Sequence, residues 1–383
     1  NVPSFGDPDH KRALRLQEIL QPDRNSFAVI RLIAALSVLV SHCYLLQSGL
    51  AESEPLRAWT GYSLGAHGVQ VFFVLSGILV SQSLMRSTSL VDFATARILR
   101  IFPALVVCVF ATSFLLGPAL STLSIHGYLQ DGALYSYLAK TLFLTTGSAH
   151  LPQLFSNNPV PDVVNLSLWT LKYEVICYAI VALVGSLLWV STSKRSLTAA
   201  TILGWAGFMI IFPPSLGDGS GAINNLHYFL LFFGVGVAAY LTRNFLHIRA
   251  RWVGFLFVFY VLTVSTKWTT LGAALFLGYA AIFVASLDFG PLRRLANRYD
   301  LSYGTYIYGV PASQALLVLD PTLSAWSLIV LTAIVVLPLA LLSWISVERP
   351  ALAFRPRIVA LVSAAKSAAW RLGPAAKEGE GVG

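Results

Sequence analysis

Two ionisable side chains lie inside one apolar stretch near the start of the chain. Residues 25–47 contain Arg31 and His42 and no other Asp, Glu, Lys, Arg or His. Eleven residues of α-helix turn through about 1100°, which is roughly 20° more than three full turns, and rise about 16 Å. Both side chains therefore share one helix face. Such groups are costly in lipid and usually point into a protein interior or a water-filled cavity. We interpret the pair as a functional site. The alternative is an arginine that extends its charge to the membrane interface and a histidine that is hydrogen-bonded in the protein core.

A carboxylate in a later apolar stretch offers a partner for His42. Glu174 is predicted to lie roughly 12 Å from the outer end of its span, a depth similar to that of His42. A carboxylate beside an imidazole fixes the tautomer and raises the basicity, as general-base catalysis on a hydroxyl requires. The structural alternative for Glu174 is a salt bridge with Lys172 or Arg31.

A basic pair, Arg97 and Arg100, stands at the predicted start of a third apolar stretch. The two residues are three positions apart, so they lie on one side of a helix. Helix anchoring at the inner membrane face explains each residue taken singly. Together they could also bind a phosphate-bearing cytoplasmic ligand.

Five other histidines, among them His227 near the outer end of a predicted span, show no metal-ligand spacing, and we expect no metal.

The elements that must position these groups are membrane-spanning helices. The chain of 383 residues is 56% hydrophobic and only 11% charged, with a mean hydropathy of +0.71. A soluble domain of this size needs more polar surface, so the composition predicts an all-α polytopic membrane protein. Apolar runs near 20 residues predict ten spans: 26–46, 68–85, 101–120, 166–190, 197–213, 224–242, 252–267, 269–287, 301–319 and 322–346.

The basic residues are distributed as in a membrane protein. Of 26 Lys and Arg, 21 fall in one alternating set of tails and loops, and only Arg57, Lys140 and Lys267 fall in the opposite set. Arg31 and Lys172 lie within spans. This asymmetry follows the positive-inside rule and places both termini in the cytoplasm. It also argues against nucleic acid as the partner of a chain with a formal charge of +9.

Three segments follow from this prediction: a cytoplasmic tail at 1–25, a transmembrane domain at 26–346 and a cytoplasmic tail at 347–383. The last tail contains an apolar stretch at 358–372, predicted to be an amphipathic helix on the inner membrane face. The long outer connection, 121–165, holds an apolar piece at 133–146 that is too short to cross, and then an irregular loop at 152–161. Cys43, Cys108 and Cys177 lie in apolar spans, which implies no disulfide framework.

Six short stretches, in this order, give the chain a family resemblance. They are Arg31 with His42 ten residues beyond it, Gly68–Gly77, Arg97–Pro103, Ser167–Glu174, Ser302–Tyr308 and Trp344–Pro350. Together they resemble the acyltransferase-3 membrane proteins, which O-acylate surface polysaccharides and related glycans. The sequence departs from the usual pattern at Gln70, where many relatives carry an acidic residue, at Lys172, where proline is frequent, and at Gly309, where some carry histidine.

The resemblance implies a ten-span enzyme of the bacterial inner membrane. Such a protein takes an acyl group, most often acetyl, from acyl-CoA on the cytoplasmic side and transfers it to a sugar hydroxyl at or beyond the outer face, as in lipopolysaccharide or exopolysaccharide. The resemblance assigns His42 as general base, Glu174 as its support and Arg31 as the group that holds or polarises the donor. It makes Arg97 and Arg100 candidates for the coenzyme A phosphates.

A second function class uses the same residues differently. In a transporter or glycan exporter, the buried Arg31, His42 and Glu174 would form a proton or anion pathway. Such proteins show broken helices in matching halves, and the sequence has no such internal symmetry. We therefore favour the acyltransferase as the interpretation of the sequence, with acyl-CoA, a glycan acceptor and membrane lipids as its partners.

Overall fold

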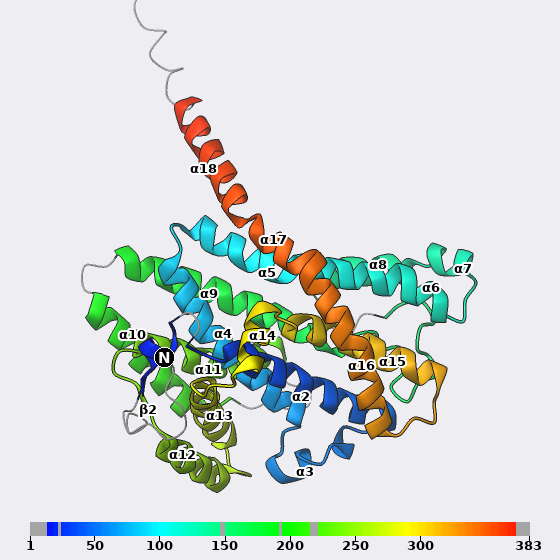
Figure 1. Ribbon diagram of the computed structural model, residues 1–383, viewed down its shortest axis with the longest axis horizontal. Helices are drawn as coiled ribbons and strands as arrows, with labels where there is room; N and C mark the ends of the chain where they lie inside the picture. Colours follow the sequence, from blue (N-terminus) through cyan, green and yellow to red (C-terminus); the bar gives the residue numbers. More distant parts are fainter. Residues whose placement is uncertain (1–13, 22–23, 146–149, 191–193, 215–220, 373–383) are drawn as a thin grey trace, which may run out of the picture.

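The computed structural model describes residues 14–21, 24–145, 150–190, 194–214 and 221–372, and these form a bundle of helices (Figure 1). The one sheet in these ranges is a two-stranded antiparallel pair, β1 (Leu14–Arg15) and β2 (His247–Ile248). The all-α membrane fold predicted from composition is confirmed.

Each of the ten predicted spans contains a helix. These helices are α2 (Phe27–Ser48), α4 (Leu64–Arg86), α5 (Leu90–Ala111), α9 (Leu171–Val190), α10 (Lys194–Ile211), α11 (Ala222–Leu241), α12 (Ala250–Thr263), α13 (Thr269–Ala285), α15 (Ser302–Leu319) and α16 (Ala325–Ser343). Within the described ranges, six stretches are long and apolar enough to cross a membrane: Phe27–Ser48, Leu64–Arg86, Leu90–Leu120, Leu166–Ser186, Ala222–Leu241 and Ala325–Ala365. The count of ten crossings stays a prediction.

Shorter elements connect and extend these helices. They are the helices α1 (Leu16–Ile19), α3 (Arg57–Thr60), α6 (Gly117–Leu120), α7 (Ile125–Gln130), α8 (Gly132–Leu142), α14 (Pro291–Arg298), α17 (Arg349–Ala353) and α18 (Arg355–Leu372), the 3₁₀ turns η2 (Ala51–Ser53) and η4 (Leu166–Thr170), and the π-helical turns η3 (Thr112–Leu116) and η5 (Trp344–Glu348).

Helix α4 lies at the centre of the bundle, between α2 and α11, because glycines let the backbones approach. A Cβ atom on Gly77 would stand 2.1 Å from the Phe233 carbonyl oxygen of α11. A Cβ atom on Gly68 would stand 2.6 Å from the Ala34 carbonyl oxygen of α2. Small residues at such crossings are how membrane helices pack without a hydrophobic driving force. Helix α15 packs on the other side of α2, which is thereby held between two neighbours.

The basic pair lies inside a helix and not at its start. Helix α5 begins at Leu90, where the Ser89 side chain accepts a hydrogen bond from the Asp92 N–H and caps the first turn. Arg97 and Arg100 are therefore in its second and third turns, and the predicted boundary at residue 101 was wrong by about three turns of helix.

The outer connection and the ends of the chain pack on the bundle. Helix α8 runs beside α5, and the loop at 152–161 is irregular, as predicted (Figure 1). Leu16 and Ile19, in the predicted N-terminal tail, are buried. The predicted helix at 358–372 is part of α18, which continues the line of α16 and extends away from the bundle (Figure 1).

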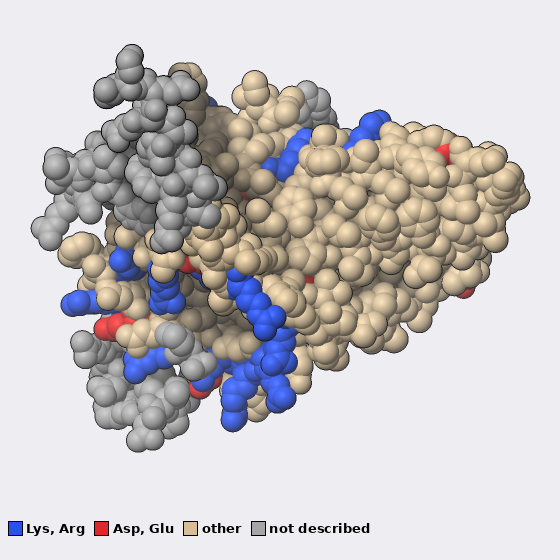
Figure 2. All heavy atoms as spheres, turned by 90° about the horizontal axis from the view of Figure 1, so that it is seen from above, with Lys and Arg blue, Asp and Glu red and all other residues tan. Residues whose placement is uncertain are grey.

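On the face that Figure 2 shows, Lys and Arg gather toward one end of the molecule, and the opposite end shows few of them. This distribution agrees with the basic asymmetry read from the sequence. Which side of the membrane each end occupies stays a prediction.

Candidate active site

Two cavities lie along α2, and Val69 and Tyr306 line both of them. The first, which we call the His42 cavity, has a volume of about 190 Å³. The second, the Arg31 cavity, has a volume of about 80 Å³. Helix α2 supplies Arg31 to the Arg31 cavity and Ser41 and His42 to the His42 cavity. The sequence prediction that Arg31 and His42 share one face of this helix accounts for the arrangement.

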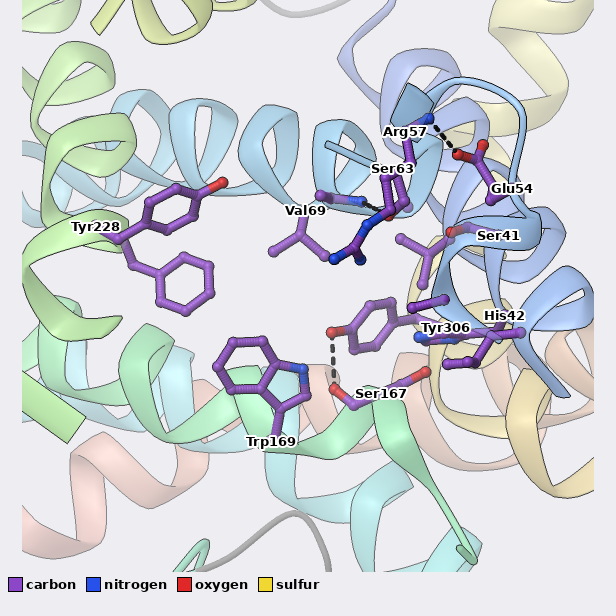
Figure 3. Close-up of a pocket in the computed structure, with 16 residues that line it drawn as sticks. Ser41, His42, Glu54, Arg57, Ser63, Val69, Ser167, Trp169, Tyr228 and Tyr306 are labelled. Atoms are coloured by element: carbon purple, nitrogen blue, oxygen red, sulfur yellow. Dashed lines mark hydrogen bonds between the residues drawn. The ribbon is translucent and has the colours of Figure 1, made fainter. Parts of the chain in front are cut away.

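The His42 cavity is bounded by α2, α4, α11, η4 and the connection between α2 and α4 (Figure 3). Its aromatic walls are Trp169, Tyr228, Phe229 and Tyr306. No described residue forms a hydrogen bond with the His42 imidazole. A nitrogen of that ring is therefore free to accept a proton from a molecule in the cavity.

The Arg31 cavity contains the three arginines that the sequence singled out, Arg31, Arg97 and Arg100. Arg31 Nη1 lies 2.9 Å and Arg100 Nη2 lies 2.8 Å from the same oxygen, Oδ2 of Asp300. Arg100 also reaches Glu348 at 3.4 Å, a carboxylate whose residue is only 1% exposed. Two of the three positive charges are therefore balanced by carboxylates.

Asp300 stays ionised between its two arginines. Burial by itself would raise the pKa of this carboxyl, but Arg100 and Arg31 outweigh it. The Ser302 hydroxyl and N–H also bind Asp300, at 2.5 and 3.2 Å, and the pKa is held well below its usual range. The carboxylate is thus a fixed negative charge at the start of α15.

Arg97 is the arginine of this cavity that forms no ion pair with a described residue. Its guanidinium contacts the Ser83 hydroxyl at 3.4 Å and lies 5.7 Å from the centre of the Tyr178 ring. Its Nε atom is buried and has no hydrogen-bond partner among the described residues. An anionic ligand in this cavity would satisfy that group, and Arg97 is better placed for the task than Arg100.

Glu174 lies in the Arg31 cavity, away from His42. It accepts hydrogen bonds from the Ser76 hydroxyl at 3.0 Å and from the Tyr178 hydroxyl. The expected contact between Glu174 and the imidazole is therefore not formed, because the carboxylate binds Ser76 of α4 and Tyr178 of its own helix. The alternative salt bridge is not formed either: Arg31 pairs with Asp300, and the Lys172 ammonium lies over the Tyr173 ring at 4.8 Å.

Tyr306, which lines both cavities, is held at their boundary by hydrogen bonds and ring packing. The Tyr306 hydroxyl donates a hydrogen bond to the Ser167 carbonyl oxygen at 2.7 Å and pairs with the Thr170 hydroxyl at 2.6 Å. Its ring meets Phe72 edge to face, with centroids 5.8 Å apart. These bonds join α15 to η4. Tyr303 and Tyr306 are each 8% exposed, so the aromatic-belt role that their position suggests does not apply to them.

Sequence reasoning missed several residues of the site. Asp300 stands two positions before Ser302, where α15 begins, and a lone carboxylate at a helix start could have signalled it. Tyr228 lines the His42 cavity, whereas its neighbour His227 packs against Phe208 with ring centroids 5.2 Å apart. Arg57 also lines the cavity, although the sequence suggested only an outer loop.

Two known proteins are similar to the chain over most of its length. A protein described as an O-acetyl transferase, from Shigella phage Sf6, is 29% identical over 340 residues, which cover 85% of this chain and 95% of that protein. Nodulation protein 10 of Rhizobium leguminosarum bv. viciae is 27% identical over 366 residues, with 88% and 95% covered. No solved structure matches the chain.

The family pattern described as "Acyltransferase domain", that of the acyltransferase-3 proteins, matches residues 24–348. This range includes both cavities and every arginine, histidine and carboxylate discussed above. The chain therefore belongs to the acyltransferase-3 family.

Proposed function

We propose that the protein transfers an acetyl group from acetyl-CoA to a hydroxyl group of an extracytoplasmic or lipid-linked glycan. The observation that carries the proposal is the pair of cavities that meet at Val69 and Tyr306. One holds the arginines and the other holds His42. A thioester in one cavity and an alcohol in the other can therefore approach each other at the boundary that Val69 and Tyr306 line. Membership of an acyltransferase family supports the reaction class.

The donor occupies the Arg31 cavity in this proposal. The coenzyme A phosphates bind Arg97, which forms no ion pair with a described residue, and Arg100, which lines the same cavity. The pantetheine arm passes Arg31 and brings the thioester toward Val69 and Tyr306. The rise of about 16 Å from Arg31 to His42 is within the reach of such an extended arm.

The chemical step takes place in the His42 cavity. His42 removes the proton from the acceptor hydroxyl as its oxygen attacks the thioester carbonyl carbon. A C–O bond forms, the C–S bond breaks, and the thiolate leaves with the proton from the imidazolium. The acetyl group then belongs to the sugar and coenzyme A is released. Direct transfer needs no nucleophilic serine or cysteine.

The phage O-acetyl transferase is the relative whose description matches this proposal most directly. We propose that the acceptor here is a surface polysaccharide or its lipid-linked precursor, and that the protein resides in the bacterial inner membrane. The basic asymmetry of the loops supports a donor site that faces the cytoplasm.

A His42→Gln variant tests the role of the imidazole. Purified protein in lipid nanodiscs is incubated with labelled acetyl-CoA and with polysaccharide extracted from cells that lack the protein. Acceptor-dependent release of coenzyme A should fall by at least about 10²-fold, the usual contribution of a general base. His126→Gln, at an exposed position in α7, is the matched control and should keep full activity. Full activity of the properly inserted His42 variant would refute the assignment, and ion-coupled uptake without release of coenzyme A would favour a transporter.

A further inference from the structure

The His42 cavity contains a positive charge that the proposed reaction has not yet used. Arg57 begins α3, in the connection between α2 and α4, and lines the cavity. In Figure 3 its guanidinium extends toward the middle of the cavity, where Val69 and Tyr306 also point. These two residues line the boundary that the thioester must reach.

The acidic residue nearest to it in the chain, Glu54, also lines the cavity but forms no ion pair with the Arg57 guanidinium. Glu54 is 4% exposed, and its two oxygens accept hydrogen bonds from the backbone N–H groups of Arg57 and Leu64, each at 3.1 Å. A carboxylate engaged by two backbone donors serves to fix the chain between η2 and α4. Glu54 therefore holds the base of Arg57 in place and leaves its guanidinium free.

The remaining carboxylate contact of Arg57 is weak. Glu52 Oε1 lies 4.0 Å from Arg57 Nη2, and the Glu52 side chain is 76% exposed. Exposed ion pairs at that separation contribute little. By contrast, Arg31 and Arg100 share Asp300 at less than 3 Å. Of the described residues that line the His42 cavity, Arg57, whose side chain is 36% exposed, is thus the cation available to a bound molecule.

The reaction creates a negative charge at this place. When the acceptor oxygen attacks, the thioester carbonyl oxygen becomes an oxyanion, and the proton of the hydroxyl moves to His42. Stabilisation of such an oxyanion by prepositioned donors is usually the largest single contribution to acyl transfer. We propose that Arg57 is a catalytic residue that donates hydrogen bonds to this oxyanion. The assignment rests on the proposed acyl transfer.

The competing role for Arg57 is to bind an anionic group on the acceptor, such as a carboxylate or a phosphate. The two roles differ in what they change. Oxyanion stabilisation acts in the transition state and raises kcat with every acceptor, whereas recognition of an anionic acceptor lowers KM for that acceptor alone.

The kinetic experiment compares Arg57→Gln and Arg57→Lys with Lys267→Gln, which removes another basic residue of the predicted outer set. Each protein is assayed in nanodiscs with acetyl-CoA and two acceptors, the extracted polysaccharide before and after chemical reduction of its carboxyl groups. Arg57→Gln should lower kcat by about 10²-fold with both acceptors and leave KM unchanged. Arg57→Lys should recover part of the loss, and Lys267→Gln should match the wild type.

A binding experiment separates catalysis from damage to the fold. Carboxymethyl-CoA carries anionic oxygens close to the position of the oxyanion, and ethyl-CoA does not. The wild type should bind carboxymethyl-CoA more tightly, and Arg57→Gln should lose this preference while its affinity for ethyl-CoA is retained. A variant that is merely misfolded would lose affinity for both ligands.

Three results would overturn the assignment of Arg57: a kcat equal to that of Lys267→Gln, an effect confined to KM for the unreduced acceptor, or an unchanged preference for carboxymethyl-CoA. An inactive wild-type protein would instead refute the proposed acyl transfer itself. An active wild type with an unaffected Arg57→Gln variant would refute only the further inference.

Discussion

At the scale of single residues, Asp300 organises the charges of the Arg31 cavity. One of its oxygens faces both Arg31 and Arg100, and the other is held by Ser302. The side chains of the three charged residues are between 14% and 21% exposed, so water screens them only in part. Removing the shared carboxylate would leave two arginines without their common counter-charge.

An Asp300→Asn variant should therefore be less stable, by about 3 kcal/mol, because breaking a buried ion pair leaves a charge uncompensated. The matched control is Asp320→Asn, since Asp320 lies in an exposed turn and binds only Thr322. Thermal unfolding in detergent measures both. Equal melting temperatures for the two variants would contradict the role of Asp300.

The pH dependence of this stabilisation follows from the lowered pKa. A carboxyl group whose pKa is lower in the folded than in the unfolded state stabilises the fold fully above its unfolded-state pKa of about 4. This stabilisation is lost as the pH falls from there toward the folded-state pKa. The difference in stability between the wild type and Asp300→Asn, measured by thermal unfolding, should thus shrink as the pH falls below about 4.

We expect Glu174 to affect the binding of the acetyl-CoA donor and not the activity of His42 as general base. Because it lies in the Arg31 cavity, Glu174→Gln removes a negative charge from beside Arg97. An anionic donor should then bind better, and KM for acetyl-CoA should fall roughly two- to fivefold. The pH profile of kcat/KM should not move. A shifted pH profile with an unchanged KM would instead show that Glu174 acts on His42 in solution.

Part of this site could be predicted from the sequence. Helical periodicity alone placed Arg31 and His42 on one face, because both residues lie in one helix. The partner of Arg31 could not be found in this way, since Asp300 is 269 positions away in the chain. The pairing of Glu174 with His42 was wrong because equal depth in two helices says nothing about how each is rotated about its axis.

At the scale of the elements, the glycine contact between α4 and α11 holds the centre of the bundle. A Cβ atom on Gly236 would stand 2.0 Å from the Val74 carbonyl oxygen, and one on Gly77 would be similarly close to α11. Backbone atoms on both sides leave no flexible side chain to move aside. The two helices can therefore approach only if both positions are glycine.

A Gly77→Ala variant should be destabilised by about 1 to 3 kcal/mol, the usual effect of overpacking. Gly254→Ala is the control, because nothing lies within 4 Å of a Cβ atom at that position of α12. This second change should be neutral or stabilising by up to about 1 kcal/mol through helix propensity. The melting temperatures of the two variants in detergent test the contrast, and similar values would contradict it.

The helices themselves were mostly predictable from apolar run length, but their ends were not. Helix α5 starts at Leu90 and not near residue 101 because its first turns contain charged residues whose partners are distant in the chain. Asp92, for example, binds Arg355 at 2.7 Å, 263 positions away. A hydropathy window places such charged residues outside the span, whereas an ion pair with a distant residue allows the helix to begin earlier.

At the scale of the whole molecule, the asymmetry of basic residues predicts which end of the bundle faces the cytoplasm. The three native cysteines are buried, so they give little background to a membrane-impermeant thiol reagent. Lys267→Cys should be labelled from outside intact cells, and Arg298→Cys should be labelled only after the membrane is opened. The opposite pattern would reverse the orientation, and labelling of both from one side would contradict the predicted number of crossings between them.

The most direct test of the account uses sealed proteoliposomes with a single orientation. Acetyl-CoA is placed on the side of the Arg31 cavity and the extracted polysaccharide on the side of the His42 cavity. We expect acetylated polysaccharide with the wild-type protein and none with His42→Gln. Product at the wild-type rate from the His42 variant, or product that requires both substrates on the same side, would contradict transfer between the two cavities.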